Sequence, residues 1–326
     1  MSPRTRVAAI VVALSIGAAA LVLGVTLVQS GDEASDAGSA PTPPRAEAPP
    51  LLLDLGLRSD AQADALRRAQ RLYDRGRRRE AGRIFRRFDA LPAEIGGVFA
   101  AWPDRTVERM ERIVTANPRS ALARLHLGFA LYWSGRRDAG LASWRQALRV
   151  QPDSVSAVHA SDLLHPNSPR GLPTFVPSFG PPPAIAALPP GRQLDALERA
   201  ARRGGVRAKL LYGVALQRIG KPRSAERAYA AAAALEPGSV EAQVAAAVGR
   251  FTKDQPASAF SRLGPLARRH PREPTVRFHL GLLLLWLGQV EDARRQLVLA
   301  RSAGPRTPLG REANRYLERL ESIRTN

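Results

Sequence analysis

Three side chains able to bind metal or transfer protons lie close together in the sequence: His159, Asp162 and His165. On a helix, His159 and Asp162 share one face, because residues three apart are neighbours there. Imidazole and carboxylate groups so placed can hold a divalent cation or act as acid and base, with Ser161 and Ser168 nearby. Two histidines and one carboxylate lack the fourth ligand of a closed zinc site, so a plain loop start is the competing interpretation.

No other pattern of catalytic residues accompanies this cluster. The sequence has no phosphate-binding glycine loop, no H-E-x-x-H, no G-x-S-x-G and no calcium loop. It has no cysteine, which excludes disulfides, thiolate metal sites and cysteine nucleophiles. His126 and His279 lie in the matching strings RLHLG and RFHLG, which indicates a repeated structural role. We therefore predict no catalytic residue, no metal and no cofactor.

The two histidine strings belong to a longer repeat that must position any site. Four blocks of 34 residues (121–154, 206–239, 240–273 and 274–307) share small residues at places eight and twenty and proline at place thirty-two. Gly135, Gly220 and Gly288 occupy place fifteen, where glycine ends one helix and starts a turn. The small residues allow two helices to approach closely. Each block thus predicts a helix–turn–helix pair.

This pattern resembles the tetratricopeptide repeat (TPR), a helix–turn–helix of the same length. The resemblance implies an all-α fold, a right-handed α-solenoid of about six TPR-like helix pairs. Around the four regular blocks we predict degenerate TPR-like repeats over 51–120 and a capping helix over 308–326. Residues 155–205 exceed one period, and we predict a TPR-like repeat there with a Pro-rich insertion over 165–190.

The first fifty residues differ from this body. Residues 7–28 carry no charge and, at about 1.5 Å per residue, are long enough to cross a hydrocarbon core. Arginines precede this segment and acidic residues follow it, which places residues 1–6 in the cytoplasm and the repeats outside it. We predict a single-pass anchor in a bacterial inner membrane, followed by a disordered linker over 29–50. A cleaved signal peptide is the alternative.

In the TPR family, the first helices of the pairs line a concave groove that holds a partner peptide. The matching places in this chain hold Leu125, Phe129, Tyr132, Trp133, Arg207, Gln217, Arg218, Phe251, Phe278 and Trp286. Aromatic and arginine side chains dominate many binding surfaces. The resemblance thus implies a non-enzymatic scaffold for protein–protein interaction, with a cell-envelope peptide or protein as partner. For the row of aromatic residues at 129–133, packing against the insertion or a neighbouring helix is the alternative.

The chain is strongly basic, with a formal net charge of +20, and 46 of its 49 basic residues are arginines. A predicted basic patch lies close to the anchor and comprises Arg67, Arg71, Arg75, Arg78 and Arg79. A solvated helix face, anionic lipid and an acidic partner all fit such a patch. Nucleic acid ranks below them, because the sequence has no recognition helix and no aromatic platform for single strands.

Three alternatives to the peptide-binding scaffold stay open at this point. The chain could act like the anchored repeat proteins of cytochrome c maturation, which hold an unfolded client as assembly factors. It could be an enzyme or metal protein whose site lies at the Pro-rich insertion. Its repeats could also stack on a second copy and form a homo-oligomer.

Overall fold

The computed structural model describes residues 47–324, and all regular structure in that range is helical. The predicted cytoplasmic stub (1–6), the predicted anchor (7–28) and most of the predicted linker lie outside the described residues. Within 47–324, no helix combines the length and the apolar character that a membrane span requires.

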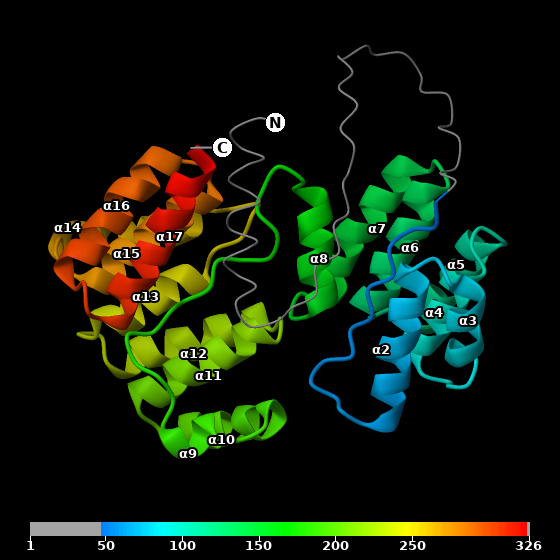
Figure 1. The fold of residues 1–326 in the computed structure, drawn as a ribbon, viewed down its shortest axis with the longest axis horizontal. Helices are drawn as coiled ribbons and strands as arrows, with labels where there is room; N and C mark the ends of the chain where they lie inside the picture. Colours follow the sequence, from blue (N-terminus) through cyan, green and yellow to red (C-terminus); the bar gives the residue numbers. More distant parts are fainter. Residues whose placement is uncertain (1–46, 325–326) are drawn as a thin grey trace, which may run out of the picture.

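Six packed helix pairs form most of the described chain (Figure 1). The pairs are α2 (Ala61–Asp74) with α3 (Arg78–Phe85), α4 (Leu91–Ala100) with α5 (Thr106–Ala116), α6 (Ala121–Trp133) with α7 (Arg137–Val150), α11 (Val206–Arg218) with α12 (Pro222–Leu235), α13 (Val240–Gly249) with α14 (Ala257–Arg269), and α15 (Pro274–Trp286) with α16 (Val290–Ala303). The last helix, α17 (Pro308–Arg324), packs on α15 and α16. The structure confirms the prediction of an all-α fold built from helix pairs.

The small residues of the repeat have the role that their spacing predicts. A Cβ atom added at Gly128 of α6 would lie 2.2 Å from Nε1 of Trp144 in α7. At the same place of another repeat, a Cβ atom on Gly213 would lie 2.3 Å from the Tyr229 ring. Both pairs of helices therefore pack a large aromatic ring directly on the backbone of the first helix. The turn glycines take positive φ angles, 84° at Gly135, 70° at Gly220 and 74° at Gly288, which other residues rarely adopt.

The block 240–273 departs from this scheme because Asp254 stands where the other repeats have the turn glycine. Its first helix, α13, ends at Gly249, and residues 250–256 form a loop instead of a tight turn. From this loop, Lys253 and Asp254 reach α8 (Val155–Leu164) and the residues that follow it. The irregular repeat thus supplies the contact between this loop and the end of α8.

The described chain has two separate hydrophobic cores. One extends from Leu51 to Ala160 and the other from Phe175 to Leu320. We call residues 48–164 the N-terminal half and residues 171–324 the C-terminal half; Figure 1 shows them beside each other. The helix α8 packs on α6 and α7, whereas α10 (Pro190–Arg203) packs on α11 and on the short α9 (Pro183–Ala186). The two long helices of the 155–205 block therefore belong to different halves.

Two extended segments complete the halves. The linker segment, residues 48–55, precedes α2, and the insertion segment, residues 171–180, lies in the connection between α8 and α9. Neither has regular secondary structure. Residues 48–50 belong to the predicted disordered linker, yet Pro49 is buried against α2, and the Tyr73 hydroxyl donates a hydrogen bond to its carbonyl oxygen at 2.6 Å.

Candidate functional site

The insertion segment lies across the first helices of three successive pairs, α11, α13 and α15. We call the side chains that receive it, Gln217, Glu241 and His279, the C-terminal face. Each belongs to one of these three helices. Of their hydrogen bonds to the segment, all but the one from the Ser178 hydroxyl involve backbone groups, so the face recognises an extended main chain.

Gln217 of α11 binds two backbone groups of the segment. Its Oε1 atom accepts the Phe175 N–H at 3.0 Å, and its Nε2 atom donates to the Pro173 carbonyl at 3.4 Å. The hydroxyl of Tyr229 also donates to Oε1, at 2.7 Å. This third bond orients the amide, because Oε1 must then face both donors. Gln217 is one of the residues that the sequence predicts to line the groove.

His279 of α15 accepts the next amide along the segment. Its Nε2 atom lies 2.9 Å from the Val176 nitrogen, and its Nδ1 atom lies 2.6 Å from the Thr275 carbonyl oxygen. A carbonyl can only accept, so Nδ1 carries the proton and Nε2 is left as the acceptor. Burial lowers the pKa of His279 to about 4, which keeps the ring neutral near pH 7.

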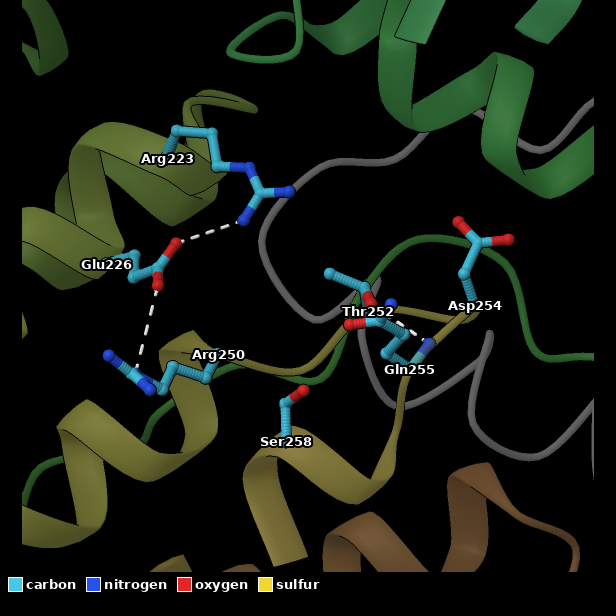
Figure 2. Close-up of a pocket in the computed structure, with 7 residues that line it drawn as sticks. All are labelled: Arg223, Glu226, Arg250, Thr252, Asp254, Gln255 and Ser258. Carbon is cyan, nitrogen blue, oxygen red and sulfur yellow. Dashed lines mark hydrogen bonds and ion pairs between the residues drawn. The ribbon is translucent and has the colours of Figure 1, made fainter. Parts of the chain in front are cut away.

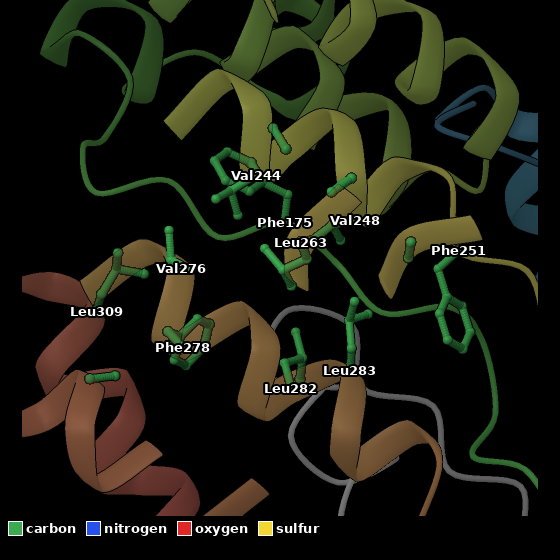
Figure 3. Packing of buried hydrophobic residues seen from close by; sticks show 14 of the residues in the cluster. Phe175, Val244, Val248, Phe251, Leu263, Val276, Phe278, Leu282, Leu283 and Leu309 are labelled. Carbon is green, nitrogen blue, oxygen red and sulfur yellow. The ribbon is translucent and has the colours of Figure 1, made fainter. Parts of the chain in front are cut away.

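Phe175 anchors the segment in the C-terminal core. Its side chain is 1% exposed, and its ring stacks on His279 at a centroid distance of 4.9 Å and meets Tyr229 edge-on at 5.5 Å. Figure 3 shows Phe175 in the same core as Val244 and Val248 of α13. An aromatic side chain of this size supplies apolar burial that the backbone hydrogen bonds alone do not provide.

The far end of the segment makes more exposed contacts. The carboxylate of Glu241 accepts the Ser178 N–H at 2.6 Å and the Ser178 hydroxyl at 3.0 Å. The guanidinium carbon of Arg207, another predicted groove residue, lies 4.9 Å from the centre of the Phe179 ring. This distance is that of a cation–π contact. The segment is thus held from Pro173 to Phe179.

The N-terminal half repeats this arrangement with the linker segment. Its N-terminal face consists of Gln70 and Tyr73 of α2 and His126 of α6. The Leu52 N–H donates to His126 Nε2 at 3.2 Å, and Gln70 Nε2 donates to the Leu51 carbonyl at 3.0 Å. Leu51 is 1% exposed, like Phe175 in the other half. In both halves, an extended segment therefore lies on first helices of pairs and donates an N–H to the histidine at the same place of the repeat.

His126 has the same protonation as its counterpart. Its Nδ1 atom lies 2.8 Å from the Leu122 carbonyl oxygen, four residues earlier, which again leaves Nε2 as the acceptor. Burial lowers its pKa to about 4 as well. The sequence predicts a repeated structural role for the two histidines, and the structure identifies that role as binding of an extended backbone.

The predicted row of aromatic residues in α6 lies in the N-terminal core. Phe129, 1% exposed, meets Trp133 and Trp144 edge-on at 5.7 and 5.6 Å. Tyr132 stacks on Trp144 at 5.4 Å, and Leu125 is fully buried. These contacts join α6 to α7. The row of aromatic residues at 129–133 therefore packs against a neighbouring helix, α7, as the alternative interpretation expects.

The remaining predicted groove residues are scattered. Phe278 is buried and meets Tyr316 of α17 at 5.8 Å, and Phe251 meets Trp286 at 6.0 Å inside the C-terminal core. Arg218 is exposed. Of the ten predicted residues, the structure therefore places Arg207 and Gln217 directly against the insertion segment, and a binding role for the others stays a prediction.

The predicted basic patch lies on α2, α3 and the turn between them. Its exposed members are Arg71, Arg75 and Arg79. Arg67 pairs with Asp64 at 3.0 Å, and Arg78 donates to the Trp102 carbonyl at 3.0 Å. Three of the five arginines thus present charge to solvent, and two make local contacts that support the fold.

Two members of the predicted histidine and carboxylate cluster, Asp162 and His165, join the two halves. Asp162 pairs with Lys253 at 2.5 Å and accepts the Gly171 N–H at 2.9 Å. His165 pairs with Asp254 at 3.0 Å. No group of three or more histidine or carboxylate side chains is placed to hold a metal ion within 47–324. The contacts of Asp162 and His165 fix the start of the insertion against the loop 250–256.

A polar pocket lies beside this junction (Figure 2). It is lined by Arg223, Glu226, Arg250, Thr252, Asp254, Gln255 and Ser258. Glu226 pairs with Arg223 at 3.0 Å and with Arg250 at 4.0 Å, and Asp254 pairs with His165. Its charged groups therefore bond to protein partners already.

The sequence did not predict that the linker segment and the insertion segment bind to helices of the repeats. Both contain a proline two residues before a fully buried apolar residue, followed by a residue whose N–H reaches a histidine: Pro49, Leu51 and Leu52, and Pro173, Phe175 and Val176. The pattern is visible once the segments are aligned. Alone, each looks like a Pro-rich connection without structure.

No protein-family model matches the chain, and no curated protein matches it in sequence. Similar solved structures include YrrB, described as a TPR protein with an unusual peptide-binding site, at 16% identity and a TM-score of 0.31 over 64% of this chain and 99% of that one. A tetratricopeptide repeat protein from Parabacteroides merdae matches at 12% identity and a TM-score of 0.34, over 79% and 98%. Yeast Tom70 matches at 11% identity and a TM-score of 0.32, over 81% of this chain and 54% of its own. The helix pairs described above define the fold.

Proposed function

We propose that this chain is a non-enzymatic scaffold that binds an extended segment of a cell-envelope protein across the first helices of its C-terminal half. The observation that carries the proposal is the pair of backbone contacts made by Gln217 and His279. A surface that holds one extended main chain through its amide groups can hold another of suitable shape.

The chemistry of the face supports binding rather than catalysis. Gln217 and His279 use their polar atoms to hold peptide groups and to satisfy neighbouring groups of the protein. The low pKa of His279 leaves it neutral, so it is poorly suited to exchange protons near pH 7. No cofactor is needed for recognition of this kind.

The proposal includes the membrane anchor predicted over residues 7–28, with the N-terminus in the cytoplasm and the repeats outside it. A flexible linker of about 20 residues would hold α2 on the order of 25 Å from the bilayer. The exposed arginines of α2 and α3 would then lie near the membrane surface, where anionic lipid attracts basic side chains.

Site-specific photo-crosslinking in cells tests the scaffold. A photoreactive amino acid replaces Arg207, next to the insertion segment, and in a matched control replaces the exposed Arg295 of α16. We expect one partner protein to crosslink through a single short peptide at position 207 and not at position 295. Equal crosslinking at both positions, or none at either, would contradict a partner site on this face.

A further inference from the structure

The two extended segments share a pattern of residues and contacts although they differ in sequence. In each, a buried proline is followed two residues later by a buried apolar residue, Leu51 or Phe175. We call this residue the apolar anchor of the segment. The next residue donates its N–H to the histidine of the face. A third apolar residue, Leu55 or Phe179, follows four places after the anchor. The occurrence of this pattern on both faces defines what each face accepts.

The pattern follows from the geometry of the contacts. Side chains alternate along an extended chain, so the proline and the anchor point to the same side and the N–H after the anchor remains free for the histidine. A proline directly after the anchor would lack that N–H. The anchor must be apolar, because its site in the C-terminal half is walled by the rings of Tyr229 and His279.

The insertion segment can leave the C-terminal face without disturbing regular secondary structure. It lies in a connection without a long helix, between the end of α8 at Leu164 and the start of α10 at Pro190. Thr174, Ser178 and Gly180 are exposed. Release of the segment would break its contacts with the C-terminal face without unwinding a helix. Its buried residues are Pro173 and Phe175.

We propose that the insertion segment is a built-in competitor, and that the partner of the C-terminal face is an extended peptide of the same pattern. Such a peptide carries proline, any residue, a large apolar residue and then a residue other than proline, with a further apolar residue near position 179. It binds by taking the place of residues 173–179 against Gln217 and His279. The inference rests on the proposed function and names the class of partner.

Tethering explains why the face would be closed at rest. A short tether gives a segment an effective concentration on the order of millimolar at its own site. A peptide added in solution binds only the fraction of molecules in which the segment has left, so its apparent affinity falls by that fraction. Weakening the segment should therefore strengthen binding of the same sequence supplied from outside.

The test uses the full-length protein in detergent and a fluorescent peptide with the sequence of residues 172–180. Binding is followed by fluorescence anisotropy with the wild type and with the variant Phe175→Ala/Val176→Pro, which loses the anchor and the N–H to His279. We expect the variant to bind the peptide at least about ten-fold more tightly than the wild type does. The same peptide with Val176→Pro should bind the variant at least about ten-fold more weakly.

A second variant guards against loss of folding. Ser178→Ala in the segment removes its exposed hydroxyl contact to Glu241, leaves the core unchanged and keeps Glu241 available to the peptide, so it should raise peptide affinity by a smaller factor. Circular dichroism and thermal melting establish that each variant is folded. Equal binding to the wild type and to both folded variants, or equal binding of the two peptides, would overturn the proposal.

The outcome is separable from that of the crosslinking experiment. Peptide binding by the opened variant without any crosslinked partner would retain the recognition pattern and reject the scaffold function. A crosslinked partner at position 207 without peptide binding would retain the function and reject the built-in competitor.

Discussion

His126 and His279 make the same pair of hydrogen bonds in two separate halves of the molecule. Each Nδ1 atom bonds to the carbonyl oxygen four residues earlier, and each Nε2 atom accepts the N–H of an extended segment. The two rings are fully buried and lie at the same place of the repeat. Both halves thus use the same place of the repeat to hold an extended segment of backbone.

Replacement of either histidine by phenylalanine tests this role in stability. Phenylalanine keeps a ring of similar size but has no acceptor for the amide, so His279→Phe leaves the Val176 N–H without its bond. We expect a loss of about 1–3 kcal/mol in the free energy of unfolding for His279→Phe, and a similar loss for His126→Phe. Urea denaturation measures both. The exposed Arg218→Ala serves as the control, and a loss no larger than that of the control would contradict the assignment.

The burial of the two rings predicts a dependence of stability on pH. Burial lowers the pKa of both histidines from 6.5 to about 4, so the unfolded chain binds more protons between these values. Their contribution to stability is therefore complete above pH 6.5 and is lost as the pH falls towards 4. At full loss it amounts to about 3 kcal/mol for each ring. Urea midpoints measured from pH 7.5 to 4.5 should fall less steeply in the double variant His126→Phe/His279→Phe, and identical slopes would refute the prediction.

The ion pair between Lys253 and Asp162 should be costly to break from one side. The Lys253 side chain is 1% exposed and that of Asp162 14%. Lys253→Met leaves the carboxylate buried without its cation, and we expect a loss of about 3–5 kcal/mol. The double variant Lys253→Met/Asp162→Asn removes that charge and keeps an acceptor for the Gly171 N–H, so it should be more stable than the single variant. Chemical denaturation compares them; equal stability would show that the charge is not the cause.

Gly213 and Gly264 offer a matched pair for close packing. A Cβ atom at Gly213 would lie 2.3 Å from the Tyr229 ring, whereas at Gly264 of α14 the nearest atom is the end of Arg268 at 3.9 Å. We expect Gly213→Ala to destabilise the protein by about 1–3 kcal/mol. Gly264→Ala should stabilise it by up to about 1 kcal/mol, because alanine favours a helix. Thermal melting distinguishes the two, and a neutral Gly213→Ala would show that Tyr229 can move aside.

The sequence predicts the repeating part of this fold well because its determinants are local. Gly135 and Gly220 mark turns, and Gly128 and Gly213 meet the aromatic residue sixteen places later in their own repeat. At Asp254 no glycine is present, and a loop replaces the tight turn between the two helices.

The candidate site was predictable only in part because its contacts are distant in sequence. The place of Gln217 in the repeat predicts that it lines the groove. The residue whose N–H it accepts, Phe175, lies 42 residues earlier. The Val176 N–H and His279 are 103 residues apart. No periodic pattern connects a Pro-rich segment to an acceptor at such a distance. The row of aromatic residues at 129–133 was open to two interpretations because Trp144, which covers part of it, lies on the next helix.

The distance between Val176 and His279 matters while the chain is being made. The N-terminal half ends at α8 and can complete its core early, since Leu52 needs only the chain up to His126. The Val176 N–H must wait for 103 further residues before His279 is made, which at about 5–20 residues per second takes about 5–20 seconds. During that interval the insertion segment leaves the ribosome before its binding face is complete. When α15 is finally synthesised, the nearest occupant for its histidine is already attached to the growing polypeptide.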